Sequence, residues 1–309
     1  MSRFIVKRLL LMLPLLLGIS VVSFTLSALS PSDPAEVALR VNDITPTTEA
    51  IAQMREELGL NASLHVRYFS WLLGVLKGDF GVSYITKTPV LHEITHALPT
   101  TLLLAGITLG LVLVWGAFLG VVCALYRNRF LDRAIRSVIF FTGAIPSFWL
   151  ALLFIAFFSL TLDLFPTAGL EERSGIILPS LTLFLSYVAT YMRLMRSNML
   201  QNEHAPYIFY ARARGLSEIR IIKHRIINAL HPFVIALGMS IPKLIAGTVV
   251  IETIFALPGV GRLCVSAIFS RDYPMIQGYV FLMALLFLLF NLLADVSIKL
   301  LDPRLRGEL

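Results

Sequence analysis

Charged residues and cysteines are scarce in this sequence. Lys, Arg, Asp and Glu make up 15% of its 309 residues, whereas a soluble globular chain carries about 25%. With 57% hydrophobic residues and a mean hydropathy of +0.81, the chain cannot hide its apolar side chains in one water-soluble core. Disorder is also excluded, because it requires low hydrophobicity. The composition predicts a polytopic membrane protein and argues against a cytosolic enzyme.

Nucleotide-binding and metal-binding patterns are also missing. No G-x-x-x-x-G-K-[ST] loop occurs, so the chain cannot bind ATP through that device. The spans lack the density of His and Cys that a site for a bare metal ion requires, and we expect neither a catalytic residue nor a metal site. Cys123 and Cys264 are predicted near opposite faces of the membrane. A pair would have to cross the bilayer, so we expect both to be unpaired.

Six stretches are long and apolar enough to cross a hydrocarbon core about 30 Å thick, which takes roughly 20 helical residues. The first follows Arg3, Lys7 and Arg8 and resembles the start of a signal peptide, but its apolar run is long and no convincing cleavage site follows. We therefore interpret it as an uncleaved span. The predicted spans are about 9–29, 100–126, 135–160, 176–198, 233–256 and 278–300.

The distribution of charge predicts how the chain is oriented. If the N-terminus is cytoplasmic, the inner segments hold a large excess of Lys and Arg over Asp and Glu, whereas the outer segments hold a small acidic excess. This pattern follows the positive-inside rule and places both termini in the cytoplasm. The net charge of +7 therefore needs no nucleic-acid partner to explain it.

The outer segment 30–99 is too long for a simple connector and predicts a small folded insertion. Thr45 can cap a helix with Pro46 at its first position, and Gly59 can end that helix. Aromatic residues follow, and they fit an interfacial belt and a partner-binding surface equally well. These aromatic residues are Tyr68, Phe69, Trp71, Phe80 and Tyr84.

The inner segment 199–232 predicts two helices joined by a tight turn. Gly215 can adopt the left-handed conformation that ends a helix. Ser217 can cap a second helix through about Leu230, and Pro232 would stop it. A basic loop near anionic lipid would explain the charge of this segment. Only a helix that docks on a cytoplasmic partner also explains its isoleucines, which are Ile219, Ile221, Ile222, Ile226 and Ile227.

The sequence around Gly215 resembles the coupling loop of ABC importer permeases, in the version of the peptide/nickel branch. The matching residues are Tyr210, Ala211, Arg212, Ala213, Arg214, Gly215 and Leu216, followed by His224, Asn228 and Pro232. Further motifs of the branch occur in order along nearly the whole chain. They are Glu57-Leu58-Gly59-Leu60 with Tyr68 and Trp71, Gly78-Asp79-Phe80-Gly81 with Ser83, Leu98-Pro99-Thr100-Thr101, Pro146-Ser147-Phe148-Trp149, Ile177-Leu178-Pro179, Glu252-Thr253-Ile254-Phe255, Pro258-Gly259-Val260-Gly261, Asp272-Tyr273-Pro274 and Asp302-Pro303-Arg304. The general Glu-Ala-Ala signature aligns with Phe209-Tyr210-Ala211, so only its last alanine is matched.

The resemblance implies an all-α permease subunit in a bacterial inner membrane. It implies an N-terminal segment with the first span (1–29), a scoop-like region (30–99) and a permease core (100–309) that includes the coupling loop 199–232. The implied partners are a second homologous permease, two ATPase subunits that hold ATP and Mg, and an extracytoplasmic solute-binding protein. Tyr210, Ala211, Ala213, Arg214, Gly215 and Leu216 would then form the contact that couples ATP hydrolysis to transport.

Ionisable residues within spans are costly and are functional candidates by default. Lys243 lies near the middle of the fifth span and either lines the pathway or pairs with Asp295 of the sixth. Glu252 fits a structural hydrogen bond as well as a pathway role. Pro146 and Pro242 can bend the helices that line the path. Segments such as Gly81-Val82-Ser83-Tyr84-Ile85-Thr86 are more similar to nickel and metallophore permeases than to dipeptide permeases, and an anionic metal chelate would suit Lys243.

Two alternatives remain open. One is a permease for di- or oligopeptides. The other is an intramembrane zinc metalloprotease, because His92-Glu93-Ile94-Thr95-His96 is a literal H-E-x-x-H. That motif lies just before Pro99, and the only other outer histidine is His65. A chance occurrence in a variable outer helix is the better explanation.

Overall fold

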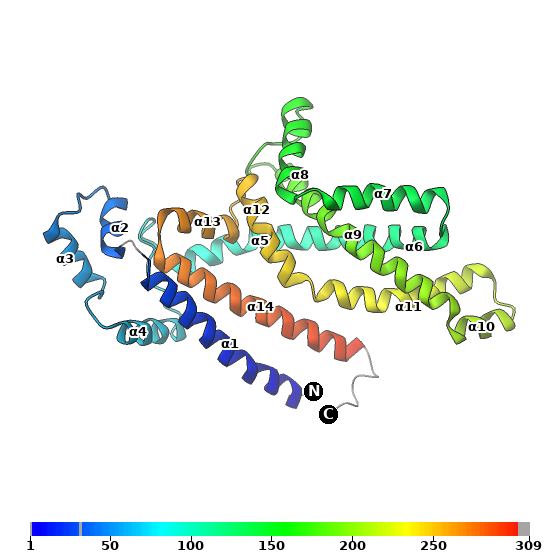
Figure 1. Ribbon diagram of the computed structural model, residues 1–309, viewed down its shortest axis with the longest axis horizontal. Helices are drawn as coiled ribbons and strands as arrows, with labels where there is room; N and C mark the ends of the chain where they lie inside the picture. Colours follow the sequence, from blue (N-terminus) through cyan, green and yellow to red (C-terminus); the bar gives the residue numbers. More distant parts are fainter. Residues whose placement is uncertain (1, 31–32, 302–309) are drawn as a thin grey trace. The chain divides into compact units, whose positions relative to one another are not determined.

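The computed structural model describes residues 2–30 and 33–301, and these form helices joined by turns, with no β-strand among them (Figure 1). The Asp302-Pro303-Arg304 motif lies outside the described residues. The chain separates into two compact units, Met1–Thr100 with Pro258–Leu292 and Thr101–Leu257 with Leu293–Leu309. The predicted regions 30–99 and 100–309 concern membrane topology and stay predictions.

The first unit contains four helices before the second span and two after the fifth. They are α1 (Ser2–Ala28), α2 (Pro34–Val41), α3 (Thr48–Glu57), α4 (Leu64–Leu76), α13 (Val260–Ser270) and most of α14 (Tyr273–Leu301), together with the start of α5 (Val90–Leu111). Its core joins Val75 and Phe80 to Val90 and Ile94 of α5 and to Met275 of α14. The segment between α1 and α5 is therefore a folded element that apolar packing holds in place.

The second unit contains the rest of α5 and seven further helices. They are α6 (Ala117–Leu125), α7 (Phe130–Ala144), α8 (Ser147–Phe154), α9 (Ile177–Gln201), α10 (Pro206–Ala213), α11 (Glu218–Gly238) and α12 (Ile241–Ile254). The π-helical segments Val112–Gly116 and Ile155–Thr161 continue α5 and α8, and short 3₁₀ turns flank α9.

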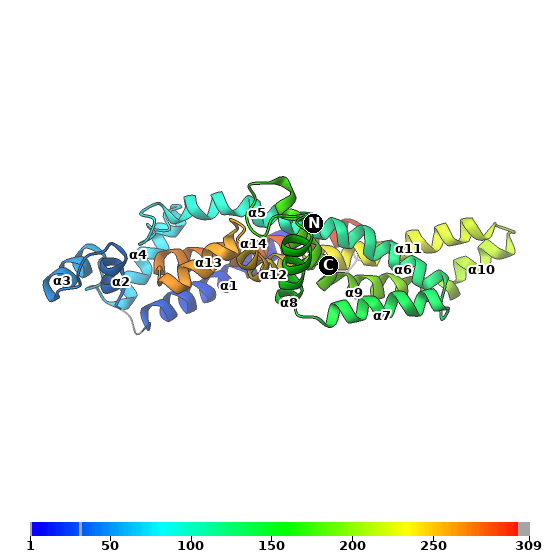
Figure 2. The same ribbon diagram turned by 90° about the horizontal axis from the view of Figure 1, so that it is seen from above.

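Helix α9 is the centre of the second unit, and it packs against α6, α7, α8, α11 and α12 (Figures 1 and 2). Buried residues recur at helical spacing along it, at Val188, Met192, Met195 and Met199. Gly120 of α6 allows close approach, because a Cβ there would lie 2.5 Å from the Met195 Cβ. Small residues at such crossings are typical of helices packed in membranes.

Within residues 2–30 and 33–301, four continuous helices and two bent pairs are long and apolar enough to cross a membrane, which gives up to six spans if each bent pair is one span. Within its most hydrophobic window, 61% of the residues of the α9 span are buried, against 22% for α1 and 6% for α14. The bent pairs are α7 with α8, at 100°, and α11 with α12, at 55°. Pro146 and Pro242 lie at the starts of α8 and α12, so the prediction that they accompany bends is confirmed.

The helix that contains the second predicted span, Val90–Leu125, is 36 residues long, about 54 Å at 1.5 Å per residue, and begins before the predicted span. Two predicted boundaries are wrong. Helix α3 is capped by Thr47, because the Thr47 side chain accepts the Ala50 N–H at 3.2 Å, so Thr45 and Pro46 precede the cap. Helix α11 continues through Pro232 to Gly238, because packing of Ala229, Phe233 and Leu237 against α9 offsets the hydrogen bond that proline cannot donate.

Candidate functional site

The turn between α10 and α11 has the geometry that the sequence predicted. Gly215 adopts φ +72°, the left-handed region. The Leu216 N–H donates to the Ala211 carbonyl at 3.1 Å, and the Gly215 N–H donates to the Arg212 carbonyl at 2.9 Å. These two bonds form a Schellman motif, which satisfies the last carbonyls of α10. Ser217 occupies the N-cap position of α11 with extended backbone, but its side chain makes no capping hydrogen bond, so the predicted cap is present in position only.

The tip of this helix pair exposes apolar and basic residues together. Phe209, Tyr210 and Ile219 are 72%, 68% and 80% exposed, whereas Ile208 and Ile221 are buried beneath them. The six predicted contact residues, from Tyr210 to Leu216, lie around the same turn. Exposed apolar patches on a soluble surface mark contacts with partners, and α10 lies beyond the C-terminal end of α9 (Figure 1).

Arg225 fixes the base of the helix pair, and the sequence analysis missed it. Its guanidinium is 7% exposed, donates to the Met199 carbonyl at 3.2 Å and lies 3.6 Å from the Glu203 carboxylate. The Asn198 amide donates to the Ala229 carbonyl at 3.3 Å. Two hydrogen bonds thus join the end of α9 to α11. The signal was available, because Arg225 lies four residues from Ile221 and from Ala229 on the buried face of α11.

The bend between α11 and α12 is braced by two tyrosines of α9. The Tyr191 hydroxyl donates to the Ser240 hydroxyl, and the Tyr187 hydroxyl donates to the Lys243 carbonyl at 3.3 Å. Gly247 makes room for the second tyrosine, because a Cβ there would lie 2.6 Å from the Tyr187 hydroxyl. The two tyrosines lie one turn apart, so α9 contacts the chain on both sides of the bend.

Lys243 follows the bend directly, and its side chain is exposed in this subunit. Among the residues that the structure describes, no ion pair joins Lys243 to Asp295. Asp295 is half-buried near the end of α14. Non-helical backbone at membrane depth is tolerated where it lines a water-filled cavity or is buried in protein. A charged side chain that is exposed beside such a bend fits a water-filled path.

Glu252 has different surroundings. Its carboxylate is fully buried and accepts hydrogen bonds from the hydroxyls of Thr101 and Thr248 at 2.7 and 2.8 Å. Pro242 is also buried, whereas Pro146 is exposed. Buried polar groups are costly unless they are hydrogen-bonded, and the Thr101 hydroxyl joins α5 to Glu252 of α12.

Asp132 is a second polar centre that the sequence analysis missed. Its carboxylate is fully buried and binds the guanidinium of Arg196 through two hydrogen bonds of 3.0 and 3.1 Å. Arg136 donates to it at 2.9 Å, and so does the backbone N–H of Asn128. These bonds join the start of α7 and the loop before it to the end of α9. The spacing Asp132 to Arg136 was visible in the sequence, but Arg196 is 64 residues away.

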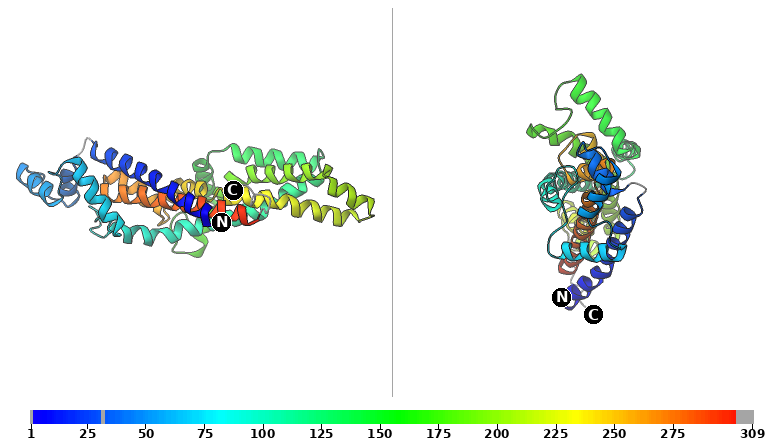
Figure 3. Two further views of the ribbon diagram at one scale, coloured as in Figure 1. Left: turned by 90° about the horizontal axis from the view of Figure 1, so that it is seen from below. Right: turned by 90° about the vertical axis from the view of Figure 1, so that its left-hand side faces the viewer.

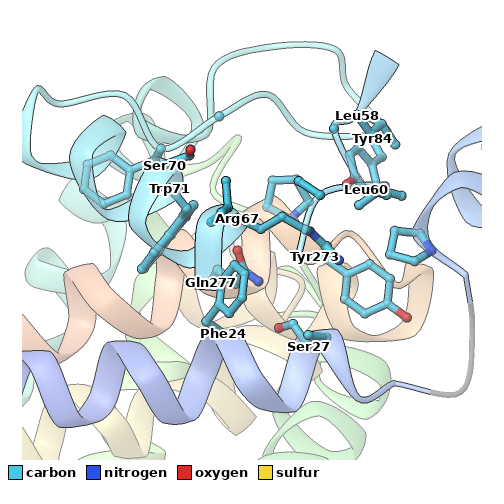
Figure 4. A pocket seen from close by; sticks show the side chains of 18 residues that line it. Phe24, Ser27, Leu58, Leu60, Arg67, Ser70, Trp71, Tyr84, Tyr273 and Gln277 are labelled. Atoms are coloured by element: carbon cyan, nitrogen blue, oxygen red, sulfur yellow. The ribbon is translucent and has the colours of Figure 1, made fainter. Parts of the chain in front are cut away.

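The first unit contains a hollow of about 420 Å³ beside α4 (Figure 4). Of the predicted aromatic cluster, Tyr68 and Trp71 pack on Phe24 of α1, and Phe80 packs on Phe281 of α14. Phe69 remains 59% exposed. The aromatic residues therefore hold the scoop region on α1 and α14, and Phe69 alone of the five presents a largely exposed ring.

Arg67, Tyr84 and Gln277 line the same hollow (Figure 4). Burial and the nearby Asp272 carboxylate raise the pKa of Tyr84 to about 12, so its hydroxyl stays protonated at neutral pH. Asp272 is buried, accepts the Ser83 hydroxyl and also accepts the Tyr84 N–H at 3.2 Å. The Gly81–Ser83 and Asp272–Pro274 motifs are thus joined by one buried carboxylate.

The H-E-x-x-H segment forms the first turns of α5. The rings of His92 and His96 stack with centroids 6.3 Å apart, and Glu93 accepts the Thr88 hydroxyl at 2.6 Å. No group of three His, Cys, Asp or Glu side chains that could hold a metal ion occurs in the residues that the structure describes. Glu93 therefore acts as a bond to the preceding loop.

Comparison with known proteins agrees with this architecture. The family model described as the binding-protein-dependent transport system inner membrane component matches residues 116–307, and the model for the N-terminal part of such membrane components matches residues 1–105. The chain is 42% identical to the metal-staphylopine import system permease protein CntB of Staphylococcus aureus (strain NCTC 8325 / PS 47), over 99% of each chain. It is 37% identical to the oligopeptide transport system permease protein AppB of Bacillus subtilis (strain 168), also over 99% of each chain.

Among solved structures, the chain is similar to one in inward-facing conformations of the MetNI methionine ABC transporter, at a TM-score of 0.56 and 19% identity. The match covers 69% of this chain and 97% of that one. At this identity the likeness concerns the fold alone.

Replacement of Asp132 tests its structural role. Asp132→Asn removes the charge between Arg136 and Arg196, and we expect a loss of about 1–3 kcal/mol in the free energy of unfolding, as for buried groups left without a full partner. Thermal unfolding of the detergent-purified protein measures the change. Asp163→Asn is the matched control, because Asp163 is exposed and asparagine tolerates its positive φ. Equal unfolding temperatures for Asp132→Asn and the unaltered protein would show that this ion pair does not stabilise the fold.

Proposed function

The chain belongs to the family of binding-protein-dependent transport system inner-membrane components and is a permease subunit of an ABC importer, and we propose that it carries a transition metal, such as nickel, held by an anionic chelator. Permeases of this kind are polytopic inner-membrane proteins that work with ATPase and substrate-binding partners. The subunit is accordingly a transport component and not an enzyme.

The assembly that we propose has four membrane-associated subunits. This permease pairs with a second, similar permease, and two ATPase subunits bind Mg and ATP on the cytoplasmic side. Both termini of this chain lie in the cytoplasm, in agreement with its excess of basic residues on that side. The translocation path runs between the two permeases, and an extracytoplasmic binding protein delivers the cargo to the outer unit.

The observation that carries the coupling mechanism is the turn at Gly215. The exposed Phe209, Tyr210 and Ile219 fit a cleft of an ATPase subunit, and Ala211 and Ala213 allow close approach. Closure of the ATPases around nucleotide moves this helix pair. Because Arg225 bonds its base to the end of α9, the movement passes to α9 and to the bend that the α9 tyrosines brace. The subunit then changes between inward-open and outward-open states.

The cargo proposal rests on Lys243 and on the 42% identity to a permease named for metal-staphylopine import. An exposed ammonium at the bend attracts an anion, and a metal held by a polycarboxylate is commonly anionic. The second candidate cargo is a di- or oligopeptide, which is favoured by the 37% identity to an oligopeptide permease. A peptide carboxylate would meet the same ammonium, so uptake of the two cargoes has to be compared directly.

The coupling role predicts a specific defect for Gly215→Arg. A side chain at φ +72° strains the turn and projects into the open space that now surrounds Gly215. We expect the complex to assemble, at least in part, and to hydrolyse ATP while uptake is lost. Reconstituted vesicles report both rates, and Gly78→Arg provides the matched control, because Gly78 is also an exposed glycine with positive φ and open space around it, in the loop after α4. Full uptake by Gly215→Arg would refute the role of this turn.

If Lys243 attracts an anionic cargo, uptake depends on a positive charge at position 243. Lys243→Met should lower uptake of nickel bound to a polycarboxylate chelator on the order of tenfold, the effect of losing one charge-assisted hydrogen bond, at normal membrane levels. Lys243→Arg keeps the charge and should retain most uptake. A labelled tetrapeptide, tested in parallel with the same reconstituted complex, separates the two cargoes. Unchanged chelate uptake by Lys243→Met would contradict the proposal, and transport of the peptide alone would favour the second cargo.

A further inference from the structure

Five arginines gather at one end of the second unit. Arg127 follows α6, Arg133 and Arg136 lie on the first turns of α7, and Arg193 and Arg196 lie near the end of α9. Arg136 and Arg196 share Asp132, as described above. Arg127, Arg133 and Arg193 are exposed and form no ion pair in the part of the chain that the structure describes. The cluster therefore keeps a large positive charge.

These arginines line two adjoining hollows. One of about 520 Å³ is polar and includes Arg127 and His204 in its lining. The other, of about 430 Å³, lies between α7 and α9 and is lined by Ile139, Phe140 and Met192. Arg136 and Arg193 line both hollows. A charged chamber thus opens into an apolar groove.

The groove leads from the arginines toward the middle of the two helices. The Asp132–Arg196 bonds join the start of α7 to the end of α9, so the helices run in opposite directions. Further along, a Cβ on Gly143 would lie 3.1 Å from the Ala189 Cβ, which marks a close crossing. Figure 3 shows α7 and α9 along each other in the same unit. Between these two contacts the ring of Phe140 remains 68% exposed.

The coupling loop indicates on which side of the membrane the arginine cluster lies. Gln201 and His204 of the polar hollow directly precede α10. Under the proposed function, on which this step rests, α10 meets the cytoplasmic ATPases. The arginines then lie at the level of the inner leaflet headgroups, and the apolar groove extends into the hydrocarbon. Basic pockets between spans on the cytoplasmic side are typical sites for anionic lipid headgroups.

We propose that this groove binds an anionic phospholipid. The guanidinium groups of Arg127 and Arg193 bind the phosphate, because the planar fork of arginine matches phosphate oxygens, and an acyl chain packs against Ile139, Phe140 and Met192. A soluble phosphate would need the charged chamber but not the apolar groove that continues it. Arg136 and Arg196 add positive charge while they hold Asp132.

The test measures lipid retention by the purified transporter complex. The complex is exchanged into detergent micelles that contain phosphatidylcholine and a small fraction of phosphatidylglycerol, and retained lipid is counted by native mass spectrometry. We expect retention of phosphatidylglycerol over phosphatidylcholine, and a fall in that preference of roughly tenfold to thirtyfold in the Arg127→Gln/Arg193→Gln variant, since each basic residue near an anionic surface contributes about a factor of five. Arg129→Gln is the matched control, because Arg129 lies over the Tyr126 ring and lines neither hollow.

The remaining outcomes decide against the proposal. No preference for phosphatidylglycerol in the unaltered complex would overturn it, as would an equal loss in Arg129→Gln. Inorganic phosphate that displaces the lipid at equal concentration would assign the chamber to a free anion. Crosslinking of a photoreactive phenylalanine analogue at position 140 to the second permease instead of to lipid would assign the groove to protein. The phosphate competition is measured on the unaltered complex, and lipid retention is measured without uptake. A negative result for lipid binding therefore leaves the proposed transport function untouched.

Discussion

Packing around α9 is the constraint on which the second unit depends. Five helices contact this one helix, and its methionines at 192, 195 and 199 fill the space against α6 and α11. Gly120 and Gly143 let α6 and α7 approach it closely. In a bilayer, close packing of this kind takes over the role that burial from water has in soluble proteins. Any displacement of α9 therefore has to be followed by the helices around it.

Hydrogen bonds and an ion pair at several positions along α9 supplement this packing. Arg196 binds Asp132 near the charged end, the Met199 carbonyl accepts Arg225 at the coupling loop, and Tyr187 and Tyr191 hold the bend before Lys243. Each of these groups would be costly if it were buried alone. Together they connect the coupling turn, the arginine cluster and the exposed lysine through one helix.

The sequence predicted the features that depend on residues close together in the chain. Hydrophobic runs predicted the long apolar helices, and Gly215 predicted the left-handed turn between α10 and α11. Boundaries failed where packing outweighed local signals, as at Pro232, where burial of Phe233 keeps α11 continuous. The ion pair of Asp132 with Arg196 and the hydrogen bonds of Tyr187 and Tyr191 could not be predicted, because they join residues far apart in the chain. Glu252 was identified as a candidate, but only the positions of Thr101 and Thr248 showed which groups bond to it.

The central claim is that closure of the ATPases around nucleotide moves the turn at Gly215, and that α9 transmits this movement to the bend between α11 and α12. The most direct measurement is the rate at which Lys243→Cys reacts with a membrane-impermeant maleimide, in a background with Cys123 and Cys264 replaced by alanine and with the ATPases either free of nucleotide or trapped with ATP and vanadate. The account predicts that trapping changes this rate severalfold, and that Tyr187→Phe with Tyr191→Phe abolishes the change while ATP hydrolysis persists. A rate that does not respond to trapping, or that responds equally without the two hydroxyls, would contradict it.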